Sequence, residues 1–156
     1  MVSRLWKVGL AALFFGLLAQ PTLAIDNPDA PDLVAGFEAR AKPLEDSVDQ
    51  AAGGGGALPT ALNAYSAFLD RELNTAYASL MARLSPALRR DLQQSQRRWL
   101  AWRQSELAFI DRQWTREAAG SSASLTRGLY RNALVKQRTL TLLQYLREIP
   151  SASAQR

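Results

Sequence analysis

Residues 69–114 read LDRELNTAYASLMARLSPALRRDLQQSQRRWLAWRQSELAFIDRQW, and this stretch decides the fold. Its pattern predicts two long helices that meet at Ser85 and Pro86. Serine is a strong N-cap residue, and proline is tolerated at the first helical position because no hydrogen bond is lost there. We expect the first helix to span about 59–84 and the second about 86–118.

Apolar side chains recur at three- and four-residue steps on both helices, which is typical of amphipathic helices. On the first helix one stripe comprises Leu69, Leu73, Ala76, Leu80 and Leu84. On the second helix one stripe comprises Leu88, Leu92, Trp99, Trp102 and Phe109, and another comprises Leu100, Leu107, Ile110 and Trp114. Because so wide an apolar face requires burial against two neighbours, we expect this hairpin to be the core of the fold.

A third helix is expected from Leu125 to about Arg147, after a loop over 120–124 that begins with a glycine stop signal. A weak extra helix is expected over 32–50, with Asp32 as its cap and a break or kink at Pro43. No alternating strand pattern stands out. The sequence therefore predicts an all-α fold, in which a third packed helix and a weak N-terminal helix accompany the antiparallel hairpin.

The N-terminus resembles a secretory signal peptide. Arg4 and Lys7 precede an apolar run of about a dozen residues, Val8–Ala19, and small residues lead to Ala24. The run is shorter than the roughly 20 residues of a membrane span, although a retained N-terminal anchor is the alternative. We expect residues 1–24 to be cleaved, leaving a periplasmic or secreted chain with no stable membrane span.

Composition divides the remaining chain into three parts. Residues 25–57 form an acidic arm, which ends in the glycine run Gly53–Gly56, expected to be a flexible linker. Residues 58–148 form the helical domain, and residues 149–156 form a tail that we expect to be disordered.

Charge is distributed unevenly between these parts. Residues 25–57 carry seven acids and two bases, for a net charge of −5, whereas residues 58–156 carry fifteen bases and seven acids, for a net charge of +8. For an exported chain, nucleic acid is excluded as a partner. Anionic envelope polymers, lipid head groups or the chain's own acidic arm are better candidates for the basic part.

Several kinds of site are excluded by composition. The chain has neither cysteine nor histidine, so it lacks disulfides, thiolate nucleophiles and the commonest metal ligand and general base. No catalytic motif or phosphate-binding glycine loop occurs, and no pair of carboxylates is singled out for acid–base chemistry. We expect no catalytic residues, no cofactor and no metal site.

Polar residues of the hairpin fall on two faces that antiparallel pairing brings opposite each other. Asp70, Asn74 and Tyr77 share one face of the first helix, and Gln96, Trp99 and Arg103 share one face of the second. One interpretation is a polar pocket framed by the two aromatic rings, in which the guanidinium of the last residue binds a carboxylate or phosphate. The other is a structural clasp that satisfies these groups and fixes helix register.

Four arginines, Arg89, Arg90, Arg97 and Arg98, form a second cluster that is either an anion- or partner-binding stripe or a solvated helix face. The tryptophans Trp99, Trp102 and Trp114 lie at helical spacing, and we expect the same kind of position for Tyr130 and Tyr145 on the third helix. Helical spacing of aromatic residues favours core positions over a ligand site.

The patterns LDRELNTAY (69–77), QRRWLAWRQSE (96–106) and LYRNALVKQRTLTLL (129–143) together resemble a bacterial exported family, the lysozyme inhibitor LprI-like, N-terminal domain family. Its two motifs are matched here by Asp70, Leu73, Asn74 and Tyr77, and by Gln96, Trp99 and Arg103. A Thr and an Arg of the family's last helix match more loosely, at Thr139 and Arg138. Many members carry cysteines that this chain lacks.

The resemblance implies an exported helical binding protein that inhibits lysozyme without catalysing a reaction. Such an inhibitor would place a polar side chain, here Arg97, Arg98 or another exposed arginine near the hairpin turn, between the two catalytic carboxylates of the glycosidase. Animal lysozymes are strongly basic, so the basic domain would not steer the encounter. The alternative is a cell-envelope module that binds an anionic polymer or another protein partner.

Overall fold

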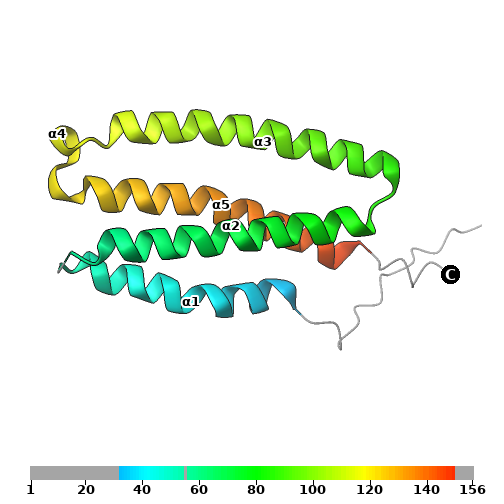
Figure 1. Ribbon diagram of the computed structural model, residues 1–156, viewed down its shortest axis with the longest axis horizontal. Coiled ribbons are helices and arrows are strands. Elements are labelled where there is room, and N and C mark those ends of the chain that lie inside the picture. Colours follow the sequence, from blue (N-terminus) through cyan, green and yellow to red (C-terminus); the bar gives the residue numbers. More distant parts are fainter. Residues whose placement is uncertain (1–31, 55, 150–156) are drawn as a thin grey trace, which may run out of the picture. The chain divides into compact units, whose positions relative to one another are not determined.

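The computed structural model describes residues 32–54 and 56–149, and these form helices joined by short connections (Figure 1). The helices are α1 (Leu33–Ala52), α2 (Leu58–Arg83), α3 (Pro86–Gln113), the short α4 (Arg116–Ala119), the 3-10 helix η1 (Gly120–Ser122) and α5 (Ala123–Glu148). Within these residues there is no strand, which confirms the all-α class. The predicted signal peptide, the leader up to residue 31 and the tail from residue 150 lie outside the described residues.

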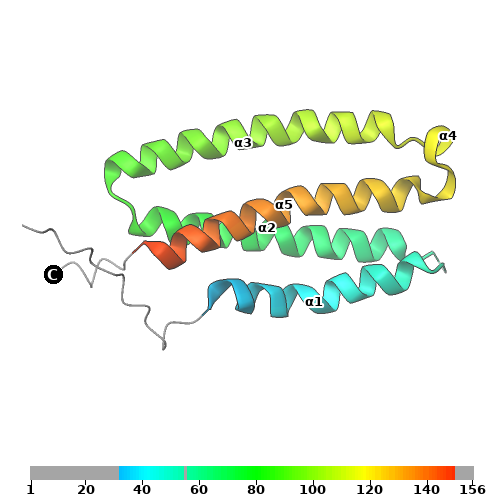
Figure 2. The same cartoon turned by 180° about the vertical axis from the view of Figure 1, so that it is seen from behind.

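The core is formed by α1, α2 and α5, which lie side by side, while α3 lies on the other side of the α2–α5 pair (Figures 1 and 2). The most intimate packing joins α2 to α5, and α1 covers the groove between them. The apolar stripe of α2 is buried as expected, from Leu69 and Leu73 to Ala76 and Leu80. It faces α1 and α5 more than α3.

Gly128 explains how closely α2 and α5 approach each other. A Cβ atom at this position would lie 2.5 Å from Cδ1 and 2.7 Å from Cδ2 of Leu62 on α2. Real Cβ contacts do not come this close, so a side chain at position 128 would force Leu62 to move. The glycine therefore permits the close contact between the N-terminal parts of α2 and α5.

The hairpin has the boundaries that its turn predicts. α2 ends at Arg83, the side chain of Ser85 accepts a hydrogen bond from the Leu88 backbone amide, and Pro86 opens α3. The two helices are antiparallel, yet their Cα atoms approach within 8 Å at isolated points at most. The hairpin exists as predicted, but it is not the closely packed core of the fold.

The burial of α3 differs most from the sequence prediction. Of its two expected apolar stripes, only Leu92 and Ile110 are buried, whereas the exposed large side chains include Leu88, Leu100, Trp102 and Phe109. The physical reason is that α1 and α5 already cover the apolar stripe of α2. Helix α3 consequently has α5 as its main neighbour and keeps both flanks open to solvent.

The N-terminal helix is present and capped by Asp32, whose carboxylate accepts hydrogen bonds from two backbone amides. The helix packs firmly against the rest of the fold. Phe37 and Ala41 are fully buried, and the Phe37 ring lies 5.9 Å from that of Phe68 on α2. The helix also continues through Pro43 without a break.

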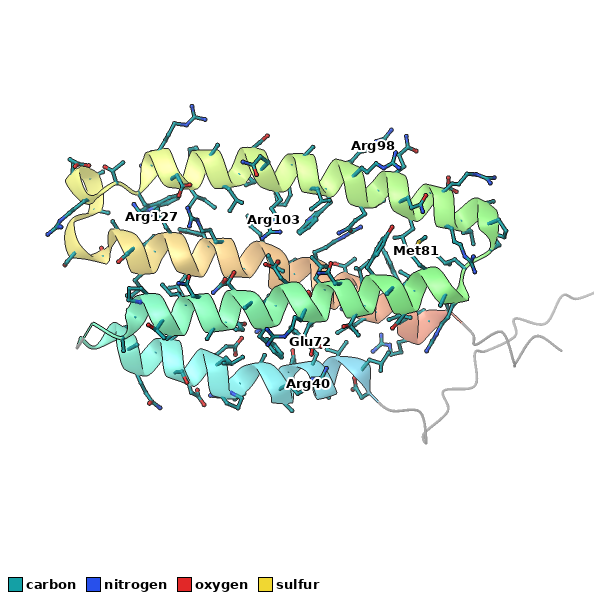
Figure 3. All side chains as sticks on the ribbon, viewed as in Figure 1. Arg40, Glu72, Met81, Arg98, Arg103 and Arg127 are labelled. Atoms are coloured by element: carbon teal, nitrogen blue, oxygen red, sulfur yellow. The ribbon has the colours of Figure 1, made fainter. Side chains whose placement is uncertain are left out.

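Two ion pairs hold α1 on its neighbours, so part of the acidic arm docks on the basic domain. Arg40 forms two hydrogen bonds to the Glu72 carboxylate on α2, at 2.7 and 3.2 Å (Figure 3). The Glu45 carboxylate accepts hydrogen bonds from the Tyr65 hydroxyl and, at 2.7 Å, from Lys136 on α5.

The second hairpin helix ends at Gln113, earlier than the predicted residue 118. Thr115 then caps the short α4, and Gly120 adopts a positive φ of 59° where the chain turns into η1. The third long helix begins at Ala123 and ends at Glu148, within two residues of the predicted boundaries.

Candidate functional site

A groove of about 520 Å³ runs between α2 and α3, and most of the family-motif residues line it. We call it the motif groove. Its α2 side comprises Asp70, Leu73, Asn74 and Tyr77, and its α3 side comprises Gln93, Gln96, Arg97, Leu100 and Arg103. Six of the seven motif residues are therefore neighbours in space, on the two facing helix surfaces that the sequence spacing predicted.

Inside this groove one weak ion pair, with a long donor–acceptor distance, connects α3 to α2. Nη2 of Arg103 lies 3.5 Å from Oδ1 of Asp70, at the outer limit of a hydrogen bond. Asn74 is exposed, and neither it nor Asp70 binds Gln96, which instead accepts a hydrogen bond from Arg138 on α5. The predicted structural clasp is thus limited to the single, long Arg103–Asp70 ion pair.

Arg103 points from α3 toward the other helices, as Figure 3 shows. Its guanidinium carbon lies 5.6 Å from the centre of the Trp99 ring, within the range of a cation–π interaction. Its Nε is buried without a hydrogen-bond partner. The side chain is therefore only partly satisfied by Asp70 and the indole ring.

The position of Trp99 differs from the one that the predicted pocket requires. It does not line the motif groove but lies on the side of α3 that faces α5, packed against the core. Arg138 of α5 lies over the same ring, with its guanidinium carbon 5.9 Å from the ring centre. The indole thus lies within cation–π range of arginines from two helices.

Arg138 is a residue whose role the sequence reasoning missed. Its Nε donates to Gln96 at 3.0 Å and its Nη2 donates to Ser95 at 3.3 Å, which ties α5 to the middle of α3. Burial lowers the pKa of its guanidinium from the ordinary value. The one available signal was its loose correspondence to an arginine in the last helix of the family.

The four clustered arginines have different surroundings. Arg89 donates to the backbone carbonyl of Leu84 at 2.9 Å and so closes the hairpin turn. Arg97 lines the motif groove, whereas Arg98 points away from the other helices (Figure 3). Arg90 is exposed.

Aromatic side chains form an exposed surface on the α3–α5 side, which we call the aromatic strip and define as Trp102, Phe109, Trp114 and Tyr130. The Trp114 ring lies 5.9 Å from Phe109, edge to face, and 4.6 Å from Tyr130. Phe109 lies seven positions after Trp102, on the same helix face. Trp102, Phe109 and Tyr130 are 47%, 53% and 48% exposed.

The core positions predicted for these aromatic residues are therefore wrong for Trp102 and Tyr130, and Tyr145 is exposed as well. Trp102 also borders a second groove, of about 450 Å³, between α3 and α5. Its other lining residues are Trp99, Ala133, Leu134, Gln137, Arg138 and Thr141. The mostly apolar lining of this groove continues the aromatic strip along α5.

Together the fold and these surfaces define an all-α protein in which one long amphipathic helix lies over a three-helix core and is open on both flanks. The family described as lysozyme inhibitor LprI matches residues 50–142, more than half of the chain. The chain belongs to the lysozyme inhibitor LprI family. The match spans α2, α3, α4 and most of α5, and it leaves out nearly all of α1.

No curated protein and no solved structure matches the chain. Among the helices of residues 32–54 and 56–149, none is both long enough and apolar enough for a membrane span.

Proposed function

We propose that the protein is an exported, non-catalytic helical protein that binds and inhibits lysozyme. The family match over α2 to α5 is the observation that carries this proposal. A second support is the composition of the open flanks of α3, since tryptophan, phenylalanine and arginine are enriched in protein interfaces, and tryptophan and arginine often contribute most to binding.

Inhibition requires no chemistry from this chain. A glycosidase such as lysozyme cleaves its substrate between two carboxyl groups about 5–5.5 Å apart when it retains configuration. A guanidinium that enters the cleft would form charge-assisted hydrogen bonds with these groups and exclude the substrate. An exposed arginine of α3 supplies such a group.

Long-range charge contributes little to this encounter. Glu45 of α1 forms an ion pair with Lys136, and Glu72 of α2 forms one with Arg40. Because both carboxylates are paired within the fold, they do not attract a basic enzyme. We therefore expect inhibition to depend weakly on salt, because the contacts that matter form at short range.

An inhibition assay of the purified protein against c-type and g-type lysozymes, at low and physiological salt, tests the proposal. We expect inhibition of one type at sub-micromolar protein. No inhibition of either type at tens of micromolar would contradict the proposal. The N-terminus of the protein recovered from the cell envelope tests export, with Ile25 expected as its first residue.

A second candidate function is binding of an anionic envelope polymer. The observation that favours it is the exposure of Arg90, Arg97 and Arg98, which form no ion pair within the described residues. Such binding would weaken steeply with salt, whereas inhibition by cleft occlusion would not. The salt dependence of retention on an immobilised anionic polysaccharide separates the two candidates.

A further inference from the structure

We infer that the aromatic strip together with Arg98 is the surface that enters the lysozyme cleft, and that the motif groove on the opposite flank of α3 serves the fold. This inference rests on the proposed function and assigns its contact residues. The two surfaces lie on different sides of the same helix, so consecutive residues of α3 belong to different surfaces.

Helix geometry places Arg98 beside the aromatic strip. Arg98 precedes Trp102 by four positions, so the two side chains are neighbours on one helix face. Trp102 borders the α3–α5 groove, whereas the preceding Leu100 lines the motif groove. In the same way Arg97 lines the motif groove, while Arg98 points away from the other helices.

The chemistry of the lysozyme cleft matches that of the aromatic strip and Arg98. In lysozyme the catalytic acid lies in a hydrophobic pocket against a tryptophan, and a second carboxylate lies nearby and stays ionised. A complementary surface needs a cation for the carboxylates and apolar rings for the walls of the cleft. Arg98 and the half-exposed rings of Trp102 and Phe109 provide both.

The motif groove is less complementary to such a cleft, because its exposed apolar side chain is Leu100 and not an aromatic ring. Its exposed Arg97 shares the groove with the Asp70 carboxylate, which would repel the catalytic carboxylates, and its Arg103 is partly engaged by Asp70 and by the Trp99 ring. The α3–α5 groove, as lined by the described residues, contains Arg138 and no carboxylate. Glu106 also lies on the strip face, four positions after Trp102 and three before Phe109, so it is the exposed aromatic rings that favour the strip side.

The chain offers two matched pairs of variants for the test. Arg98→Ala and Arg97→Ala each remove one exposed arginine, and Trp102→Ala and Leu100→Ala each remove an apolar side chain of nearly equal exposure, 47% and 48%. The measurement is the inhibition constant of the purified full chain against the lysozyme that the wild type inhibits. Circular dichroism and thermal unfolding verify that each variant is folded.

We expect Arg98→Ala and Trp102→Ala to raise the inhibition constant about tenfold or more, as for central interface residues, and the two motif-groove variants to change it less than about threefold. Trp102→Phe, which keeps an aromatic ring, should recover most of the loss. The opposite pattern, or four unchanged inhibition constants with an inhibitory wild type, would overturn this surface but not the proposed function. A wild type that does not inhibit would overturn both.

Discussion

Arg103 of α3 and Asp70 of α2 approach each other to 3.5 Å between Nη2 and Oδ1, across the groove that the family motif lines. A second arginine–carboxylate pair, Arg40 with Glu72, links α1 to α2 through two hydrogen bonds, the shorter at 2.7 Å. Both carboxylates belong to α2. The contribution of the Arg103–Asp70 pair to stability can therefore be compared with that of the Arg40–Glu72 pair in the same protein.

We expect Asp70→Asn to lower the free energy of unfolding by about 0.5 kcal/mol or less, because a long, half-exposed ion pair contributes little. Glu72→Gln should cost about 1 kcal/mol, because it removes a bidentate charge-assisted interaction at a less exposed carboxylate. Urea unfolding at neutral pH measures both. A larger cost for Asp70→Asn would show that the motif pair acts as a strong clasp.

Gly128 and Gly36 should respond to alanine with opposite signs. At Gly128 the new Cβ would overlap the Leu62 side chain, at a cost of about 1–3 kcal/mol that exceeds the helix-propensity gain of about 1 kcal/mol. At Gly36 the nearest such atom is Nη1 of Arg40 at 3.5 Å, an ordinary contact, so Gly36→Ala should stabilise by about 0.5–1 kcal/mol.

Thermal or urea unfolding of the two glycine variants checks this expectation. Adding Leu62→Ala to Gly128→Ala should give a double variant that is less destabilised than the sum of the single changes, because the overlap is gone. A Gly128→Ala variant as stable as wild type would mean that the Leu62 side chain moves aside at little cost.

The docking of α1 should depend on pH through Glu45. Burial raises the pKa of this carboxyl, but hydrogen bonds from Lys136 and Tyr65 outweigh it and lower the pKa below its ordinary value of 4.5. A lowered pKa in the folded state stabilises the fold above the unfolded pKa, and this contribution is lost as pH falls through the folded pKa. Glu45→Gln should therefore be less stable than wild type at pH 7, and the difference should vanish at acidic pH.

The measurement is the free energy of unfolding of both proteins from pH 7 down to pH 3. Glu38→Gln is the matched control, since it removes an exposed carboxylate from the same helix. A stability difference between Glu45→Gln and wild type that persists unchanged at pH 3 would argue against the Lys136 and Tyr65 hydrogen bonds as its source.

Helix α3 should open more readily than the core helices. It buries only Leu92 and Ile110, whereas α2 and α5 each bury seven residues. Local opening costs little where few side chains are buried. Hydrogen exchange followed by mass spectrometry should show faster exchange in peptides from the middle of α3 than in those from α2 and α5, and equal protection would contradict the described arrangement.

Local signals in the sequence predicted the helices well. Ser85 and Pro86 defined the hairpin turn, and Asp32 defined the start of α1, because capping depends on a few adjacent residues. The identity of the core helices could not be predicted in this way. Both α1 and α3 carry apolar faces that suit the α2–α5 groove, and only three-dimensional packing shows that Phe37 of α1 occupies it.

The candidate site could likewise be predicted only in part. Helical spacing placed Asp70, Tyr77 and Arg103 on facing surfaces, and the structure brings them to one groove. The spacing could not show that the Trp99 ring turns toward α5, because that depends on Arg138 from a distant part of the chain. The exposure of Trp102 was likewise hidden, since its spacing is that of a core residue.

The most direct test of the central claim is the kinetic mode of lysozyme inhibition with a soluble chitooligosaccharide substrate. Occlusion of the cleft by α3 predicts competitive inhibition, in which the apparent KM rises linearly with inhibitor concentration while kcat stays constant. A fall in kcat at constant KM, or no effect on either constant at tens of micromolar protein, would contradict the account.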